Sequence, residues 1–321
     1  MGVSSELHRL LYRMAQAYYL EGQTQQEIAQ RFGLSRPKVS RLLQRARDEQ
    51  IVSITLVPPR GGAAELEAAL ERRFGLQEVV LVAASDPRDS GTVARELGPA
   101  AAECLLRCLS GTETVGLAWG RTVLGMVNAL PQQAWPELTI VQISGGLGPV
   151  GVVEHSTEVA RRAAQRLNAR LRLIPAPGIV STQAAAQVLR GDPQIAETLA
   201  LARRADVAVV GLGIPSANSV LLRDGSILRL EDLDQLKAAG AVGDVALRYL
   251  DTWGDSVELE MNDRVIGLTL DEIREIPRVI GVAGGTDKVE VVRAALRGQV
   301  LDVLVSDEAT ARRLLEESGE G

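Results

Sequence analysis

The 321 residues contain only two histidines and two cysteines. So few histidines argue against a histidine-rich metal site and against most histidine-based catalysis. Cys104 and Cys108 lie four residues apart on an expected helix, where a disulfide is geometrically awkward and two thiolates alone make a poor metal site. We therefore expect both cysteines to pack in the core, and we expect no catalytic residue and no metal ligand.

The sequence has no run of eighteen apolar residues, and charges interrupt the apolar positions of its first fourteen residues. These absences argue against a membrane-spanning helix and against a secretory signal, so we expect a cytoplasmic protein. The length suits two domains, and 46% hydrophobic residues are enough for a sizeable core.

The charge is divided unevenly along the chain. Residues 1–60 hold nine Lys or Arg and five Asp or Glu, a net charge of +4, whereas the whole chain carries −6 and the remainder therefore −10. A basic head on an acidic body predicts that only the head contacts nucleic acid, because the body repels a phosphate backbone.

Residues 23–51 have the pattern of two helices separated by one glycine. Thr24 and Glu27 form a capping box for the first helix, and Gly33 allows the backbone to turn. Ser35 is placed to cap the second helix, in whose first turn Pro37 costs no hydrogen bond. The pattern predicts a helix-turn-helix.

The second helix has one apolar face and one free face. Val39, Leu42, Leu43 and Ala46 fall on one stripe, and the segment 31–47 holds six Arg or Lys and no acid. A helix face of one sign favours contact with DNA over a merely solvated surface. The residues expected at base edges are Arg36, Ser40, Arg41 and Gln44, those expected at phosphates are Gln25, Lys38 and Arg45, and Ser35 joins them at the helix start.

A helix over residues 5–20, with Leu7, Leu10, Leu11, Met14 and Tyr18 on one stripe, is expected to complete a three-helix unit. Residues 51–57 alternate like a short strand, which could serve as a wing beside the DNA or as a hinge contact. We divide the chain into a helix-turn-helix domain (1–57), a linker (58–62) and a larger C-terminal domain (63–321).

Buried strands and helices alternate from residue 63 onward. Apolar runs predict strands at 78–83, 113–119, 138–144, 206–213, 278–285 and 300–307. Helical patterns fall at 64–73, 92–109, 121–130, 156–168, 192–204, 286–297 and 307–317. This alternation predicts an α/β domain with a mostly parallel sheet covered by helices on both faces.

Four of these strands end in glycine turns, at residues 119–122, 144–146, 211–213 and 284–288. Each alone is explained as a tight turn, but two of them place a cation and a hydroxyl beside a glycine at a helix start, which suits phosphate. Neither a Walker sequence nor a complete dinucleotide-binding glycine set occurs, which argues against nucleoside triphosphates and NAD. We expect no cofactor and a small, phosphorylated effector.

The chain resembles the SorC family of bacterial sugar-binding transcriptional regulators nearly end to end. The resemblance rests on GLSRPKVSRLLQRARDEQIV (33–52), VGLAWGRT (115–122), PAPGIV (175–180), ADVAVVGLG (205–213), GAVGDV (240–245), RVIGVAGGTDKVEVVRAALRG (278–298) and VLVSDEATARRLL (303–315). It implies a C-terminal domain similar to sugar-phosphate isomerases, assembly as a homodimer or homotetramer, and operator binding controlled by a sugar or its phosphate. The effector residues that it implies are Gly120, Arg121, Thr122, Ser144, Gly145, Gly146, Asp244 and Lys288.

The chain departs from some relatives of that family at one position. Where they have a basic residue before the paired glycines, this chain has Ser144, so binding is expected to be noncovalent unless Lys288 takes that role. Two alternatives stay open. Asp244 could contact the ligand or bond the backbone of its own turn, and Glu154 with His155 could bond sugar hydroxyls or serve as a helix cap.

Two functions other than regulation fit parts of this pattern. A sugar-phosphate isomerase or deaminase carrying a DNA-binding head would need a positioned general base with a partner, which spacing does not reveal. A recombinase would need a catalytic serine domain. We therefore expect a non-enzymatic regulator that binds double-stranded operator DNA as at least a dimer, since two heads on one body raise the effective concentration of the second.

Overall fold

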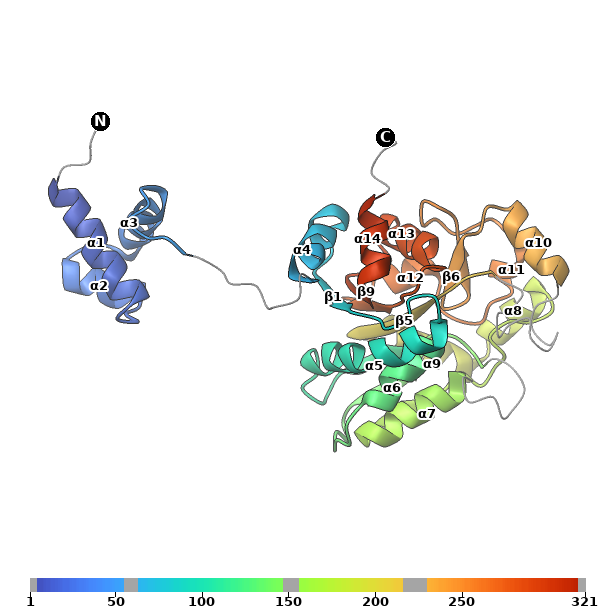
Figure 1. Cartoon of the computed structure of the whole chain (residues 1–321). Coiled ribbons are helices and arrows are strands. Elements are labelled where there is room, and N and C mark those ends of the chain that lie inside the picture. Colours follow the sequence, from blue (N-terminus) through green and yellow to red (C-terminus); the bar gives the residue numbers. More distant parts are fainter. Residues whose placement is uncertain (1–4, 55–62, 147–155, 216–229, 317–321) are drawn as a thin grey trace. The chain divides into compact units, whose positions relative to one another are not determined.

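A computed structural model describes residues 5–54, 63–146, 156–215 and 230–316 (Figure 1). The chain divides into two compact units, Met1–Arg60 and Gly61–Gly321, which are described separately. In the described ranges, no helix combines the length and the apolar character needed to cross a membrane.

The N-terminal unit consists of α1 (Ser5–Tyr19), α2 (Gln25–Phe32) and α3 (Arg36–Asp48). Its core contains the predicted apolar face of α3, in which Leu42 is partly buried, together with the fully buried Leu11, Met14 and Ile28. The predicted stripe on α1 is wrong at Tyr18, which is 36% exposed, because Ala17 points into the core instead. The three helices nevertheless form the expected unit.

The turn between α2 and α3 follows the sequence prediction except at Ser35. Thr24 and Glu27 form the capping box, and Gly33 ends α2 in the left-handed region with φ 65°. Ser35 occupies the N-cap position of α3, but its side chain makes no capping hydrogen bond. A capping side chain accepts from the second or third helical N–H. Pro37 has none, and the Lys38 N–H already donates to the Ser35 carbonyl at 2.9 Å.

The short strand predicted at 51–57 is wrong for residues 51–54, which contain no strand. The amides of Ile51 and Val52 donate to the Ala46 carbonyl at 2.9 and 3.1 Å, and both side chains pack against Leu11 and Ala46. The alternating apolar residues thus close the C-terminal end of α3. Residues 55–57 and the predicted linker 58–62 lie outside the described residues.

The C-terminal unit is built on a sheet with the strand order β1-β9-β8-β5-β2-β3-β4, and all six pairings in this order are parallel. Its strands are β1 (Glu78–Val82), β2 (Thr114–Leu117), β3 (Thr139–Gln142), β4 (Arg170–Arg172), β5 (Val207–Gly213), β8 (Val279–Val282) and β9 (Val303–Asp307). Beyond the parallel part, β6 (Gly243–Val245) pairs antiparallel with the end of β5 and with β7 (Arg248–Leu250).

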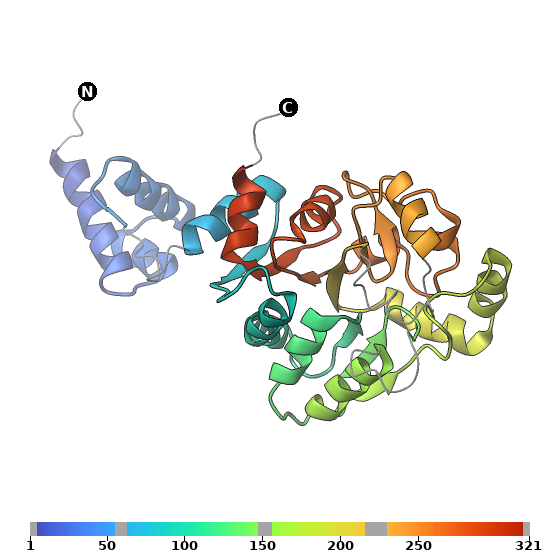
Figure 2. The same ribbon diagram turned by 45° about the vertical axis from the view of Figure 1, so that its right-hand side comes forward.

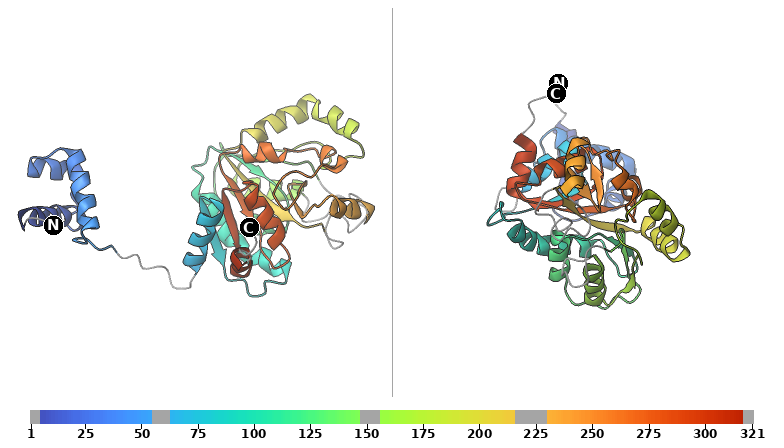
Figure 3. Two further views of the ribbon diagram at one scale, coloured as in Figure 1. Left: turned by 90° about the horizontal axis from the view of Figure 1, so that it is seen from above. Right: turned by 90° about the vertical axis from the view of Figure 1, so that its right-hand side faces the viewer.

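Helices cover both faces of this sheet, as Figure 2 and the right-hand view of Figure 3 show. One apolar core lies under α5 (Ser90–Arg107), α6 (Arg121–Ala129) and α7 (Ser156–Leu167). The other lies under α4 (Ala63–Phe74), α9 (Pro193–Arg203), α13 (Val289–Arg297) and α14 (Glu308–Glu316). Four further helices, α8 (Gln183–Arg190), α10 (Leu230–Ala238), α11 (Glu260–Asp263) and α12 (Leu270–Arg274), complete the unit. The predicted fold class is confirmed.

The six predicted strands and seven predicted helices all occur, with shifted ends. The prediction missed β4, β6 and β7, which have only three residues each, and the helices α8, α10, α11 and α12. Three residues are too few for a period to show. The helix predicted at 286–297 starts only at Val289, because the glycine turn after β8 continues through Lys288.

The topology singles out one point on the sheet. After β2 the chain moves outward through β3 to β4, then returns to place β5 on the other side of β2 and continues through β8 to β9. In open α/β sheets, ligands bind beyond the carboxyl ends of the strands where the strand order reverses in this way. That point is the end of β2 and β5.

Candidate functional site

The cations of α3 differ in what they contact. Arg45 pairs with Glu49 at 2.6 Å, and Arg31, at the end of α2, pairs with Glu21 at 3.0 Å. Within the described residues, Arg36 and Lys38 are exposed and make no side-chain hydrogen bond or ion pair. Arg36 and Lys38, at the start of α3, can therefore contact DNA without first breaking an ion pair or hydrogen bond.

The predicted base-reading residues all lie on the exposed face of α3. Ser40 is exposed, and the Arg41 Nε is 3.5 Å from the Pro37 carbonyl, a weak contact at most. Gln44 is held at both ends of its amide: it donates to Asp48 Oδ1 at 2.9 Å and accepts from Arg47 at 2.6 Å. Contact of Gln44 with a base would have to replace these bonds. Gln25, the first residue of α2, is partly buried.

Residues 120–122 lie where β2 gives way to α6. Gly120 is the N-cap of α6 with φ 129°, a conformation that favours glycine. Arg121 is exposed, and its guanidinium donates to Ser90 Oγ at 2.8 Å. Thr122 is buried, and its hydroxyl donates to the Val282 carbonyl at 2.7 Å. The Thr122 hydroxyl proton thus fastens α6 to β8 and is not free for a phosphate.

Lys288 reaches from the start of α13 to the end of β5. It is the N-cap residue of α13, and its ammonium donates to the Leu212 carbonyl at 2.7 Å. The predicted helix over 286–297 placed Lys288 inside the first turn, whereas the helix starts at Val289 and Lys288 precedes it. The residue is partly buried and its amine points inward, so Lys288 is not a solvated surface cation.

Asp244 lies beside the same strand end. It belongs to β6 and pairs in register with Gly213, where an added Cβ would be 2.1 Å from Asp244 Oδ1. Its Oδ2 accepts from the Leu247 N–H at 3.0 Å, so Asp244 does bond the backbone of its own turn. The second oxygen points toward Gly213, the last residue of β5.

The electrostatics of Asp244 and Lys288 follow from burial. Burial, with a smaller contribution from Arg121, lowers the pKa of Lys288 to about 8, although Asp287 and Asp244 oppose this shift. Burial raises the pKa of Asp244 to about 6, against the Leu247 N–H and Lys288. Both groups therefore change charge close to neutral pH. An anion bound here would favour the charged lysine.

Residues 144–146 are arranged differently from this cluster. The Gly145 N–H donates to the Ile266 carbonyl at 2.8 Å and the Gly146 N–H to the Ala176 carbonyl at 2.9 Å. An anion site at a glycine turn needs amides that are free to donate. Both of these amides already donate within the protein, so they are not available to an anion. Ser144 is 1% exposed, and within the described residues its hydroxyl has no hydrogen-bond partner. Glu154 and His155 lie outside the described residues.

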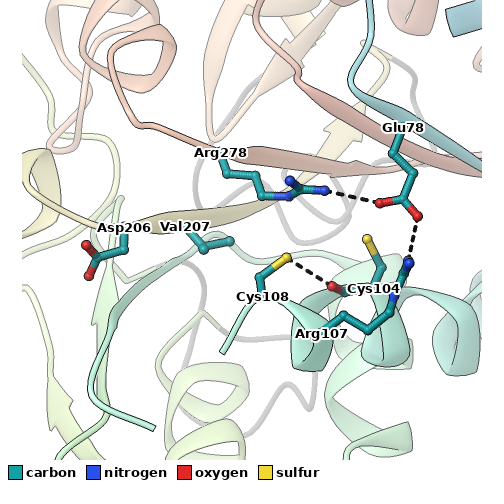
Figure 4. Close-up of a pocket in the computed structure, with 7 residues that line it drawn as sticks. All are labelled: Glu78, Cys104, Arg107, Cys108, Asp206, Val207 and Arg278. Atoms are coloured by element: carbon teal, nitrogen blue, oxygen red, sulfur yellow. Dashed lines mark hydrogen bonds and ion pairs between the residues drawn. The ribbon is translucent and has the colours of Figure 1, made fainter. Parts of the chain in front are cut away.

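A hollow of about 460 Å³ lies at the opposite, amino-terminal edge of the sheet (Figure 4). In it, Glu78 bridges Arg107 at 2.6 Å and Arg278 at 3.1 Å. Burial raises the pKa of Cys104 to about 11, and the Cys108 thiol donates to the Cys104 carbonyl. A thiol with a raised pKa, such as that of Cys104, is a poor nucleophile, and both cysteines pack against the core as predicted. Across the described ranges, no cluster of three metal-ligating residues is found.

Several residues of the candidate site were not predicted. The Leu212 carbonyl, Ser90 and Tyr249, which lies opposite Asp244 in β7, have no motif of their own. The pairing of β5 with β6 and of β6 with β7 brings Leu212 and Tyr249 to the site, and the contact of α5 with α6 brings Ser90.

Comparison with known proteins identifies both units. Residues 59–316 match the family described as "Putative sugar-binding domain", and residues 15–49 match the family described as "Sigma-70, region 4". The transcriptional regulator LsrR of Enterobacter sp. (strain 638) is 33% identical over 99% of this chain and 96% of its own. The deoxyribonucleoside regulator of Bacillus subtilis (strain 168) is 30% identical over 97% and 99%.

A solved structure of full length shows the same architecture. The sorbitol operon regulator SorC from Klebsiella pneumoniae superposes with a TM-score of 0.72 at 29% identity, covering 97% of this chain and all of that one.

Proposed function

The chain belongs to the SorC family of sugar-binding transcriptional regulators, and we propose that a phosphorylated sugar, held at the ends of β2, β5 and β8, controls its binding to operator DNA. The protein is a DNA-binding regulator with a sugar-binding effector domain. The phosphorylated form of the effector, the residues that hold it and the oligomeric state are the proposal.

The observation that carries the proposal is the convergence of three segments on the end of β5. Lys288 donates to the Leu212 carbonyl, Asp244 pairs with Gly213, and an added Cβ at Gly211 would meet Thr122 Oγ1 at 3.2 Å and the Trp119 carbonyl at 3.4 Å. This is the point at which the strand order reverses. Residues far apart in the sequence therefore face one ligand position.

In this proposal different side chains bind the phosphate and the sugar hydroxyls of the ligand. Lys288 and Arg121 bind the phosphate, with the N–H groups at the start of α6 as further donors. Asp244 has one carboxyl oxygen not used by Leu247 and accepts hydrogen bonds from sugar hydroxyls. Since the Gly145 and Gly146 amides are used within the protein, we place no phosphate there, and Ser144 can contribute only its hydroxyl.

A hollow of about 330 Å³ on the other side of the α13 start argues for this choice of side. It is lined by Asp287, Glu290 and Glu316, with Arg313 as the only cation among its lining residues. Three carboxylates repel a phosphate, so the phosphate belongs with Lys288 and Arg121. We further propose that the protein works in the cytoplasm as a homodimer or homotetramer, so that two heads engage one operator.

The test is a thermal-shift panel on the full-length protein with sorbitol 6-phosphate, ribose 5-phosphate, deoxyribose 5-phosphate, their free sugars and inorganic phosphate. A ligand at a hundred times its dissociation constant stabilises the folded state by about 2.7 kcal/mol. We expect phosphorylated sugars to raise Tm in the parent but not in Lys288→Met. Equal shifts by free and phosphorylated sugars would contradict the phosphate assignment, and turnover of any of them would favour the isomerase or deaminase alternative.

A further inference from the structure

The turn that carries Lys288 is held by a buried pair of side chains from another part of the chain. Asp307 ends β9, Thr310 lies in the first turn of α14, and both are 0% exposed. The Gly285 N–H donates to Asp307 Oδ2 at 2.7 Å and to Thr310 Oγ1 at 3.0 Å. One backbone N–H of the turn therefore has two side-chain acceptors, and both are shielded from solvent.

Asp307 and Thr310 also fix each other. The Thr310 hydroxyl donates to Asp307 Oδ2 at 2.7 Å, and the Thr310 N–H donates to Asp307 Oδ1 at 2.9 Å. Both carboxyl oxygens are thus bonded, and the pair has one orientation. An added Cβ at Gly284 would be 2.4 Å from Asp307 Oδ2, so only glycine admits the carboxyl group this close to the turn.

The hydrogen bonds of the Gly285 N–H help to fix the position of Lys288. Gly285 has φ 105°, and its carbonyl accepts from the Lys288 N–H at 3.0 Å, which closes the turn three residues later. The side chain of Lys288 then spans to the Leu212 carbonyl. A rotation of the Gly285 peptide would move this backbone anchor, and with it the lysine ammonium.

We propose that Asp307 and Thr310 are positioning residues of the effector site. Their hydrogen bonds to Gly285 set the turn at 284–288 so that the Lys288 ammonium faces the end of β5. Neither residue contacts the ligand in this account. The inference rests on the proposed role of Lys288 and adds the residues that hold it in place.

The chain offers a direct observation of Lys288, because Lys38, Lys237 and Lys288 are its only three lysines. Protein grown with lysine labelled with carbon-13 at Cε should give three side-chain signals, assigned with single Lys→Arg variants. The chemical shift of each signal reports the surroundings of one amine, and its pH titration reports one pKa. Inorganic phosphate is the first probe, followed by the sugar phosphate that gives the largest thermal shift.

Thr310→Val keeps the shape of the side chain and removes the hydroxyl. We expect it to fold, to move the Lys288 signal and leave those of Lys38 and Lys237 unchanged, and to raise the half-saturating ligand concentration about 3- to 10-fold, the effect of one lost buried hydrogen bond. Thr310→Ser should restore parental behaviour. Ser306→Ala is the matched control, since Ser306 is equally buried and, within the described residues, its hydroxyl has no partner.

Two outcomes separate the two claims. If phosphate and sugar phosphates leave the Lys288 signal of the parent unmoved, the proposed effector role of Lys288 is wrong. If the parent responds and folded Thr310→Val gives the same Lys288 signal and the same half-saturating concentration, the role of Lys288 stands and the positioning role is refuted. Should Thr310→Val fail to fold, Asp307→Asn is measured by the same signals, with the parental result again refuting the proposal.

Discussion

Lys38→Ala and Arg45→Ala should weaken DNA binding by different amounts, although both remove one cation from α3. Among the described residues Lys38 has no side-chain partner, whereas Arg45 already pairs with Glu49 at 2.6 Å. Free cations displace counterions from DNA when they bind a phosphate. A paired arginine must first leave its carboxylate, and this exchange reduces the net gain.

The expected sizes follow from these contacts. Each phosphate contact adds about 0.9 to the slope of log affinity against log salt, so the affinity lost in Lys38→Ala should be about 3- to 4-fold smaller at 200 mM than at 50 mM salt. The Arg45–Glu49 pair is partly exposed, and such pairs are worth about 0 to 1 kcal/mol. Glu49→Gln should therefore tighten DNA binding by up to about 5-fold, through Arg45.

Fluorescence anisotropy with labelled operator DNA, selected from random sequence by the protein itself, measures all of these values across salt concentrations. The double variant Arg45→Ala/Glu49→Gln is the control, because without Arg45 the change at Glu49 should have little effect. The reasoning would be refuted if Lys38→Ala and Arg45→Ala gave the same salt slope while Glu49→Gln bound like the parent.

Four further predictions concern other contacts. Arg41→Ala should cost about 1 to 3 kcal/mol of discrimination between operator and random DNA, with little change in binding to random DNA, in competition titrations. Sugar-phosphate affinity should fall as pH rises above about 8, because a bound dianion raises the pKa of Lys288 and binding then takes up a proton; calorimetry of Lys288→Met should lack this step. Burial raises the folded-state pKa of Asp244 from 3.8 to about 6, so the contribution of this carboxyl to stability should fall as pH rises from 4 to 6. Denaturant titrations of Asp244→Asn should lack this contribution. Gly125→Ala should destabilise by about 1 to 3 kcal/mol in thermal unfolding, since its Cβ would be 2.2 Å from the Ala94 carbonyl where α5 crosses α6.

The sequence predicted best what local chemistry decides. The capping box at Thr24, the left-handed Gly33 and the apolar stripe of α3 each depend on residues within one or two turns, and all three are present. Long apolar runs likewise predicted the buried strands. The capping bond predicted at Ser35 is absent because Pro37 has no N–H and the Lys38 N–H already donates to the Ser35 carbonyl.

The candidate site was predictable only in part for a related reason. Glycine turns at strand ends indicated which segments could approach a ligand, but pairing in the sheet decides which of them meet. Lys288 and Asp244 converge because β8 and β6 both pair with β5. Gly145 and Gly146 have the same sequence signature, yet their amides bond the segments at 266 and 176. No residue near Lys288 in the sequence indicated Asp307, which lies at the end of β9 and accepts a hydrogen bond from the Gly285 N–H.

The most direct test is the response of the operator complex to effector. Full-length parent, Lys288→Met and Arg121→Ala are bound to selected operator DNA and titrated with the sugar phosphate that gives the largest thermal shift. We predict equal operator affinity without ligand, a half-effective concentration raised at least about tenfold in Lys288→Met, and a smaller rise in Arg121→Ala, whose exposed guanidinium contributes less. A Lys288→Met complex that responds at the parental concentration would contradict the account.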